Sequence, residues 1–301
     1  MERRGRYYLS RIIKLGQLNQ DNLIKAMIRP VSIVTGKYAW TITDVRVIKR
    51  NKKVVYVFGK LSKYNPEGTV KVVNEREKAE TSIIEPNLIE ASSPFIYIPE
   101  FSGLAYLHVW NQIEREIFAK RFSRIIEESF DNFFVTCKIE PITDLRKFIE
   151  RLMSIDTFTE ISARIHPPNP LFGRAWKNLR EYLEKRQASE LSLKESADEK
   201  QPLNSQLLAH LRGLADQTDD ERYSPVEPVD ITDAAILMAV DGYGDGRIVG
   251  REKETRSTIV LKISERHVSF LFGADPLPDQ LFEEANKQFS KISKERNMDH
   301  A

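Results

Sequence analysis

The chain has 301 residues, of which 41% are hydrophobic and 30% are charged, and this composition excludes a disordered, collagen-like or disulfide-rich protein. Its single cysteine, Cys137, excludes an internal disulfide and any metal site built from cysteines. The net charge is only +2, from 46 basic and 44 acidic residues. No apolar run approaches the ~18–20 residues needed to cross a bilayer, so we expect a cytoplasmic protein without direct membrane insertion.

Residues 1–110 are predicted to form a basic, β-rich region. Aromatic and β-branched residues dominate Tyr38–Thr43 and Val54–Phe58, and such runs favour strands. Between them, the polar segment Lys49–Lys53 has the composition of a hairpin turn. Further short strands are predicted at 70–73, 83–84, 95–98 and 104–109.

Positive charge is concentrated at the start of the chain. Residues 1–60 carry 14 Lys or Arg against three acids, a net +11, which leaves residues 61–301 at −9 within the total of +2. A basic segment joined to an acidic body favours binding to a polyanion. The candidate nucleic-acid-binding residues are Arg3, Arg4 and Arg6 as an arm, with Arg46, Lys49, Arg50, Lys52 and Lys53 around the hairpin turn. The alternative is a solvated hairpin whose lysines protect a sheet edge from pairing.

Residues 111–186 change to a helical period. Apolar residues at the spacing of one helical face predict a helix over 112–128, and Asn111 is a suitable N-cap. There follow in order a strand at 133–139, a helix at 143–153, a strand at 158–165 and a helix capped by Asn169. Such an alternation of helices and strands is typical of a ferredoxin-like split βαβ unit.

Residues 187–230 are predicted to be an acidic and polar linker that holds one short helix at 205–215. Residues 231–301 return to a β-type composition and end in a helix. Strands are predicted at 234–240, 247–249, 257–263 and 267–272, and the closing helix at 278–295. The predicted fold class is therefore α+β, with antiparallel strands and a helix at the C-terminal end.

No stretch carries a catalytic signature. The Gly-rich run Asp241–Gly250 lacks the spacing of a phosphate-binding loop, and as a calcium loop it has Tyr243 at the third position, so we expect a turn between two strands. The five histidines are scattered without metal-ligand spacing. A metal-dependent nuclease with dispersed ligands stays an alternative, although Lys262 and Glu265 stand in the wrong order for an E-x-K pattern.

Two further stretches carry a family resemblance. The first is a strand that runs into Ile165–Pro170 and then a helix that contains Trp176. The second is Ala239–Gly246, which has a strand–D-x-x-G-D–strand pattern. Both resemble bacterial and prophage antiviral-defence proteins related to the A component of the phage lambda Rex exclusion system. The resemblance implies a dimeric, ferredoxin-like protein that binds duplex DNA with little sequence preference and acts with a separate effector in phage defence.

We therefore expect a non-enzymatic protein of a phage-defence system that binds double-stranded DNA through its phosphates, with no cofactor and no metal. The charge polarisation supports the DNA-binding prediction, and the resemblance supports the homodimer and the separate effector. Two alternatives remain. One is a protein-interaction component whose basic face docks on an acidic partner, such as the acidic body of a second copy. The other is the metal-dependent nuclease.

Overall fold

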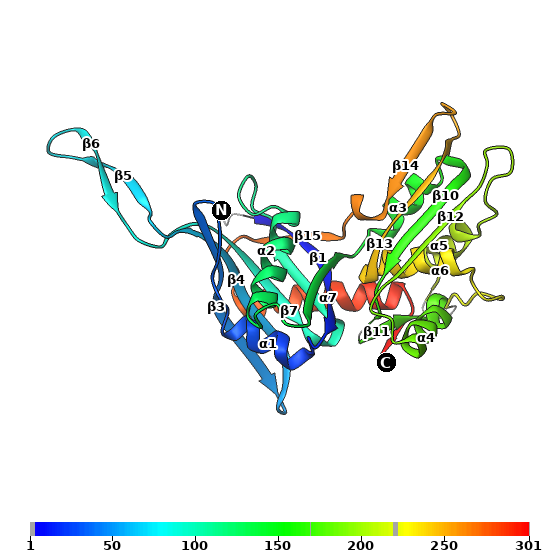
Figure 1. The fold of residues 1–301 in the computed structure, drawn as a ribbon, viewed down its shortest axis with the longest axis horizontal. Helices are drawn as coiled ribbons and strands as arrows, with labels where there is room; N and C mark the ends of the chain where they lie inside the picture. The colour runs from blue at the N-terminus through cyan, green and yellow to red at the C-terminus, as the bar shows by residue number, and fades with distance from the viewer. Residues whose placement is uncertain (1–3, 169, 219–221, 301) are drawn as a thin grey trace.

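The computed structural model describes residues 4–168, 170–218 and 222–300, and Figure 1 shows two β-sheets side by side with a narrow ribbon projecting from the first. The α+β class, the β-rich N-terminal region and the C-terminal antiparallel strands with a closing helix are all confirmed. Among the described residues, none of the helices combines the length and the apolar character that crossing a membrane requires.

The first sheet has eight antiparallel strands, in the order β15-β1-β8-β7-β4-β3-β2 with β9 as a second neighbour of β1. Its strands are β1 (Arg4–Gly16), β2 (Ile33–Thr35), β3 (Tyr38–Arg50), β4 (Lys53–Asn65), β7 (Leu88–Ile98), β8 (Gly103–Leu107), β9 (Val135–Pro141) and β15 (Ser269–Gly273). The first half of β1 lies between β15 and β8, and its second half pairs with β9. One strand therefore joins the start, the middle and the end of the chain.

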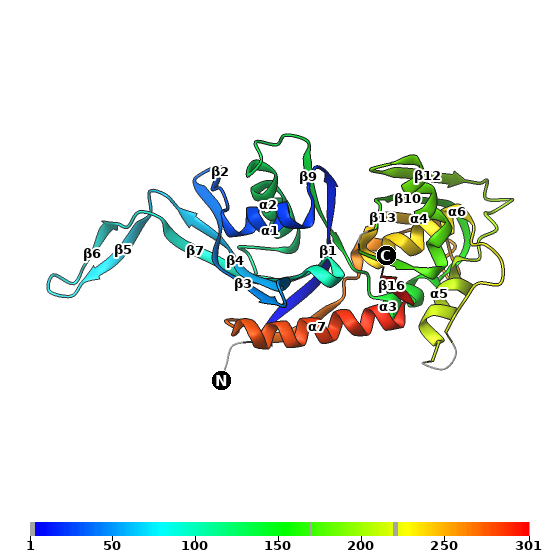
Figure 2. The same ribbon diagram turned by 90° about the horizontal axis from the view of Figure 1, so that it is seen from below.

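Helices cover both faces of the first sheet. Figure 2 shows α1 (Gln20–Ile28) and α2 (Arg115–Glu128) on one face and α7 (Pro278–Glu295) on the other. Phe118 of α2 stacks on Tyr106 of β8, with 4.1 Å between the ring centroids. The boundaries predicted for α7 are confirmed. This helix is predictable from sequence because its apolar residues follow one helical face.

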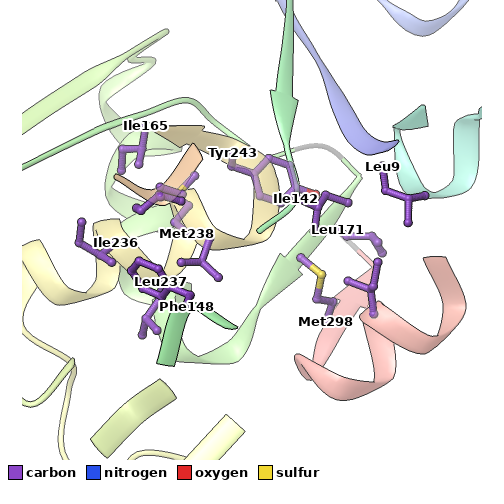
Figure 3. Close-up of a cluster of buried hydrophobic side chains, with 14 of the residues drawn as sticks. Leu9, Ile142, Phe148, Ile165, Leu171, Ile236, Leu237, Met238, Tyr243 and Met298 are labelled. Carbon is purple, nitrogen blue, oxygen red and sulfur yellow. The ribbon is translucent and has the colours of Figure 1, made fainter. Parts of the chain in front are cut away.

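The second sheet has four strands in the order β12-β10-β13-β14. Its strands are β10 (Ile155–Ile165), β12 (Leu191–Ser196), β13 (Gly244–Glu252) and β14 (Thr258–Lys262), and the helices near it are α3 (Leu145–Leu152), α4 (Lys177–Arg186), α5 (Leu207–Asp216) and α6 (Ile231–Met238). Ile165 of β10 and Ile236 of α6 belong to one buried cluster that also holds Leu9 of β1 (Figure 3). The two sheets therefore share a continuous core.

The ferredoxin-like split βαβ unit expected over 111–186 is wrong in its arrangement. β9 joins the first sheet beside β1, whereas β10 joins the second sheet between β12 and β13. A split βαβ unit needs both strands in one sheet. The physical reason is that β9 pairs with a strand from more than 110 residues earlier in the chain, and a local pattern carries no information on such a partner.

The strand expected at 234–240 is helix α6, continued by a π-helical turn at Ala239–Tyr243. Every residue from Thr232 to Met238 is buried. A helix buried on all sides has no amphipathic period, so its apolar run resembles a strand. The Gly-rich turn after it consequently joins a helix to strand β13 and not two strands, with Gly242 at φ 88°.

Two predicted helix starts also differ. Asn111 is not an N-cap: its φ is 59°, and α2 begins after Glu114. The helix expected after the proline corner begins only at Lys177, because β11 (Leu171–Gly173) first pairs with β16 (Met298–His300). Asn169, the expected cap of that helix, lies outside the described residues.

The segment expected as a linker, residues 187–230, contains regular structure. β12 pairs with β10 along 191–196, so a solvated linker is wrong there. Leu191 and Leu193 are half-buried against the core, which explains why a mostly polar stretch forms a strand. Helix α5 confirms the short helix predicted at 205–215.

The narrow ribbon in Figure 1 is formed by β5 (Thr69–Asn74) and β6 (Ala79–Ile84), which pair only with each other among the described strands. It extends the β4–β7 hairpin, whose last pair is Asn65 with Leu88. All residues of β6 are exposed. The ribbon therefore contributes little to the core.

Candidate nucleic-acid interface

The hairpin predicted around Lys49–Lys53 is confirmed. Strands β3 and β4 are joined by Asn51 and Lys52, with φ values of 49° and 66°. Positive φ at both central residues is the mark of a type I′ turn, whose twist suits a two-residue hairpin. On its other side, β4 begins to pair with β7 only at Val57 opposite Tyr97. The end of the hairpin therefore extends past the sheet as a two-stranded ribbon.

Four exposed cations lie on this end of the hairpin, and a fifth lies next to it, opposite Phe58. The four are Lys49, Arg50, Lys52 and Lys53, and the fifth is Arg46. Across residues 4–168, 170–218 and 222–300, none of the five has a carboxylate within 4.0 Å. Further along the hairpin, by contrast, Lys60 lies 3.2 Å from Asp44 and 3.4 Å from Asp275. Among the described residues, no ion pair therefore offsets the positive charge at the hairpin end.

Helix α7 packs against the hairpin through Tyr56 of β4. The Tyr56 ring is 2% exposed and stacks on Phe282 with 4.6 Å between centroids. Its hydroxyl donates to Asp279, and burial together with this hydrogen bond raises the pKa of Tyr56 well above its ordinary value. Tyr7 and Trp40 are buried as well. These aromatic side chains are therefore packing residues and present no stacking platform for bases.

The structure does not bring the N-terminal arm to the hairpin. Arg3 lies outside the described residues, and Arg4 and Arg6 are exposed at the start of β1. Through the pairs that join β1 to β8, β7 and β4, Tyr8 lies level with Gly59. Measured along the strands from this pair, Arg4 lies four residues in one direction and Lys53 lies six residues in the opposite direction. At ~3.3 Å per residue, the two side chains are therefore separated by roughly 30 Å along the strand direction. Arg6 instead lines a cavity of about 430 Å³ beside α3 and α7.

Part of the N-terminal charge is buried, which its sequence pattern did not indicate. Arg11 is 0% exposed, and burial lowers its pKa. It donates to the backbone oxygens of Asp241 at 2.8 Å and Phe101 at 2.5 Å. Burial also lowers the pKa of Lys14 to about 8, and its Nζ donates to Ser102 Oγ at 2.5 Å. These two cations belong to the interior and not to a nucleic-acid surface.

Asp241, the first residue of the Gly-rich run, is a structural residue. Its carboxylate accepts from Arg296 Nη1 at 3.0 Å and from Trp176 Nε1 at 2.8 Å. Both of its oxygens are thus occupied, which removes the reason to see it as a calcium ligand. Within the described part of the chain, no three His, Cys, Asp or Glu side chains are grouped so as to hold a metal ion.

A cluster of titratable groups lies where β9 meets the proline corner. His166 is 1% exposed, with Nδ1 3.1 Å from the Ser189 oxygen and Nε2 3.2 Å from Lys138 Nζ. Burial lowers the pKa of His166. Burial and the nearby Asp245 carboxylate raise the pKa of Glu140 to about 7. The raised pKa of Glu140 makes the stability of the folded state depend on pH.

A family model described as "Domain of unknown function (DUF4747)" matches residues 21–216, which is more than half of the chain. The search of curated proteins finds no match. The matched range holds the β3–β4 hairpin, its five cations and the β5–β6 ribbon, and it leaves out β1 and all elements from α6 onward. Neither finding bears on the resemblance to Rex-related proteins, so the defence role stays a prediction.

Proposed function

The chain belongs to the DUF4747 family, and we propose that it binds the phosphate backbone of double-stranded DNA without sequence preference and without catalysis. The observation that supports this proposal is the group of five exposed cations, unpaired among the described residues, on and next to the end of the β3–β4 hairpin. A two-stranded ribbon of this kind fits the major groove of B-DNA, which is about 12 Å wide. Lysine and arginine on such a ribbon reach phosphates on both sides of the groove.

The same geometry argues for contacts to phosphates and against readout of bases. The hairpin end offers cationic side chains, while the aromatic residues behind it are buried. Contacts of this type gain affinity from the release of counterions. Five neutralised phosphates give a slope of about −4 to −5 for log affinity against log salt concentration.

The test is fluorescence anisotropy of a labelled, random-sequence DNA duplex, titrated with the protein at several salt concentrations. In the test variant Lys49, Arg50 and Lys53 become Gln. We expect weaker binding on every duplex sequence and a salt slope reduced by about 3. The matched control changes Lys185, Arg186 and Lys200 to Gln, three exposed cations far from the hairpin in sequence. Absence of binding at low salt, or an equal loss in the control, overturns the proposal.

A second candidate function is docking on an acidic protein surface, including a second copy in a dimer. One observation favours it: residues 66–87 carry five acids against three bases, and the ribbon exposes Val73 by 63%, Ile83 by 47% and Ile84 by 71%. Exposed apolar residues beside acidic ones suit a basic docking partner. Self-association that weakens with salt, without affinity for the duplex, selects this function. The separate effector and the defence setting are proposed from the resemblance alone.

A further inference from the structure

A cavity of about 430 Å³ lies between the first sheet, α3 and α7, away from the hairpin. This size is in the range of ligand pockets, about 300–1,000 Å³. Its charged lining residues are Arg6 from β1, Asp144, Arg146 and Lys147 at the start of α3, and Lys291, Glu295 and Arg296 at the end of α7. Cations from three elements therefore meet around one space.

The charges around this cavity do not balance. Lys147 Nζ is 2.8 Å from Asp144, and Lys291 Nζ is 3.6 Å from Glu295, so both lining carboxylates are already paired. Arg6 and Arg146 have no carboxylate partner within the described ranges. Arg6 Nη1 donates only to the neutral Ser269 Oγ, at 3.0 Å. Two exposed guanidinium groups are therefore free to bind an anion.

The wall of the cavity also contains a buried donor without an acceptor. Arg296 is 4% exposed and sends Nη1 to Asp241 and Nη2 to the Thr143 oxygen. Its Nε has no hydrogen-bond partner in the part of the chain that the structure describes. This atom is buried away from the cavity, so Arg296 adds positive charge to the wall and no hydrogen bond to a ligand.

The first turn of α3 adds backbone donors to the same wall. Asp144 is its N-cap and accepts from the Lys147 N–H at 3.2 Å. The N–H groups of the first helical residues, Leu145 and Arg146, have no partner within a helix by its geometry, and both residues line the cavity. The positive end of the helix dipole favours an anion here.

We propose that this cavity binds a phosphate monoester, as carried by a mononucleotide or by the 5′ end of a nucleic-acid strand. Arg6 and Arg146 bind the phosphate oxygens through charge-assisted hydrogen bonds. The first-turn N–H groups of α3 complete the set of donors. Val268 and Ile292 line the rest of the wall and contact the sugar or base. The site is independent of the hairpin and of the function proposed for it.

Isothermal titration calorimetry with AMP, inorganic phosphate and adenosine tests the site. We expect AMP and phosphate to bind and adenosine not to bind. Arg146→Gln, at an exposed position, is expected to weaken AMP binding about 10-fold or more. Arg151→Gln, an exposed arginine at the other end of α3, is the matched control and is expected to bind AMP as the unchanged protein does. Unfolding temperatures verify that both variants fold.

The two sources of the phosphate are separated with short single strands that carry either a 5′-phosphate or a 5′-hydroxyl. The protein for this arm has Lys49, Arg50 and Lys53 changed to Gln, so that hairpin contacts do not contribute. A preference for the 5′-phosphate that disappears on adding Arg146→Gln assigns the site to strand ends, whereas binding of AMP alone assigns it to free nucleotides. The proposal is overturned if none of these phosphates binds, or if Arg146→Gln binds them unchanged.

Discussion

At the junction of the two sheets, one carboxylate balances a buried cation. Asp241 is 4% exposed and is held by Arg296 and Trp176. Asp241→Ala leaves the Arg296 guanidinium buried without an opposite charge, so we expect the free energy of unfolding to fall by about 3–5 kcal/mol. Urea unfolding measures this loss. Glu254→Gln, at an exposed position, is the control and should change stability by less than about 0.5 kcal/mol. Equal losses in the two variants contradict the assignment.

Glu140 gives the protein a pH-dependent stability. Its pKa rises from 4.5 to about 7, chiefly because the side chain is buried and then because Asp245 is near. The folded state thus holds this proton more tightly than the unfolded state does, so the free energy of unfolding falls as pH rises from 4.5 towards 7. Glu140→Gln removes this loss.

We expect Glu140→Gln to be more stable than the unchanged protein at pH 8, by at most about 3 kcal/mol, and the difference to shrink towards pH 4.5. Urea unfolding of both proteins across this pH range gives the comparison. The neighbours Lys138 and Arg164 partly offset the effect, because their charges favour the carboxylate. The prediction is contradicted if the stability of Glu140→Gln minus that of the unchanged protein is smaller at pH 8 than at pH 5.

At the scale of elements, the sequence pattern predicts those helices and strands whose own residues carry the signal. The helix α7 follows a single apolar face, and the β3–β4 hairpin has two β-type runs around polar residues. Elements whose character depends on burial were not predictable in this way. Helix α6 is enclosed on all sides, and the pairing of β9 is decided by β1. The hairpin cations are predictable because they are close together in the sequence. Arg146 and Lys291 are not, because they line one cavity from helices that are far apart in the sequence.

The β5–β6 ribbon is expected to be dispensable for stability. Residues 66–87 are replaced by Asn-Gly, which closes Asn65 onto Leu88 with a two-residue turn. Because the ribbon pairs with itself and β6 is wholly exposed, we expect the unfolding midpoint to change by less than about 3 °C. Thermal unfolding followed by circular dichroism provides the measurement. A much larger drop in the unfolding midpoint shows that the ribbon stabilises the fold, and loss of duplex binding by the shortened protein shows that the ribbon takes part in binding.

At the scale of the whole molecule, the family-matched range is not a folding unit. Residues 21–216 lack β1, which lies between β15 and β8 and also pairs with β9, and they lack β13 and β14 of the second sheet. We expect this fragment to be unfolded or aggregated, because it exposes strand edges and apolar faces. Circular dichroism and size-exclusion chromatography of residues 21–216 against residues 1–301 provide the test. A monomeric fragment with a cooperative unfolding transition contradicts it.

The place of β1 has a consequence for synthesis on the ribosome. The residues of β1 are made before the rest of the first sheet, and the β15 residues that flank them, such as Ser269 opposite Tyr8, are made more than 250 residues later. At a translation rate of 5–20 residues per second, this delay is roughly 10–50 s. During that interval the side of β1 that β15 covers stays unpaired, and an open strand edge of this kind favours association with other chains. Pairing of the late-made β15 with β1 is therefore the step that completes the first sheet.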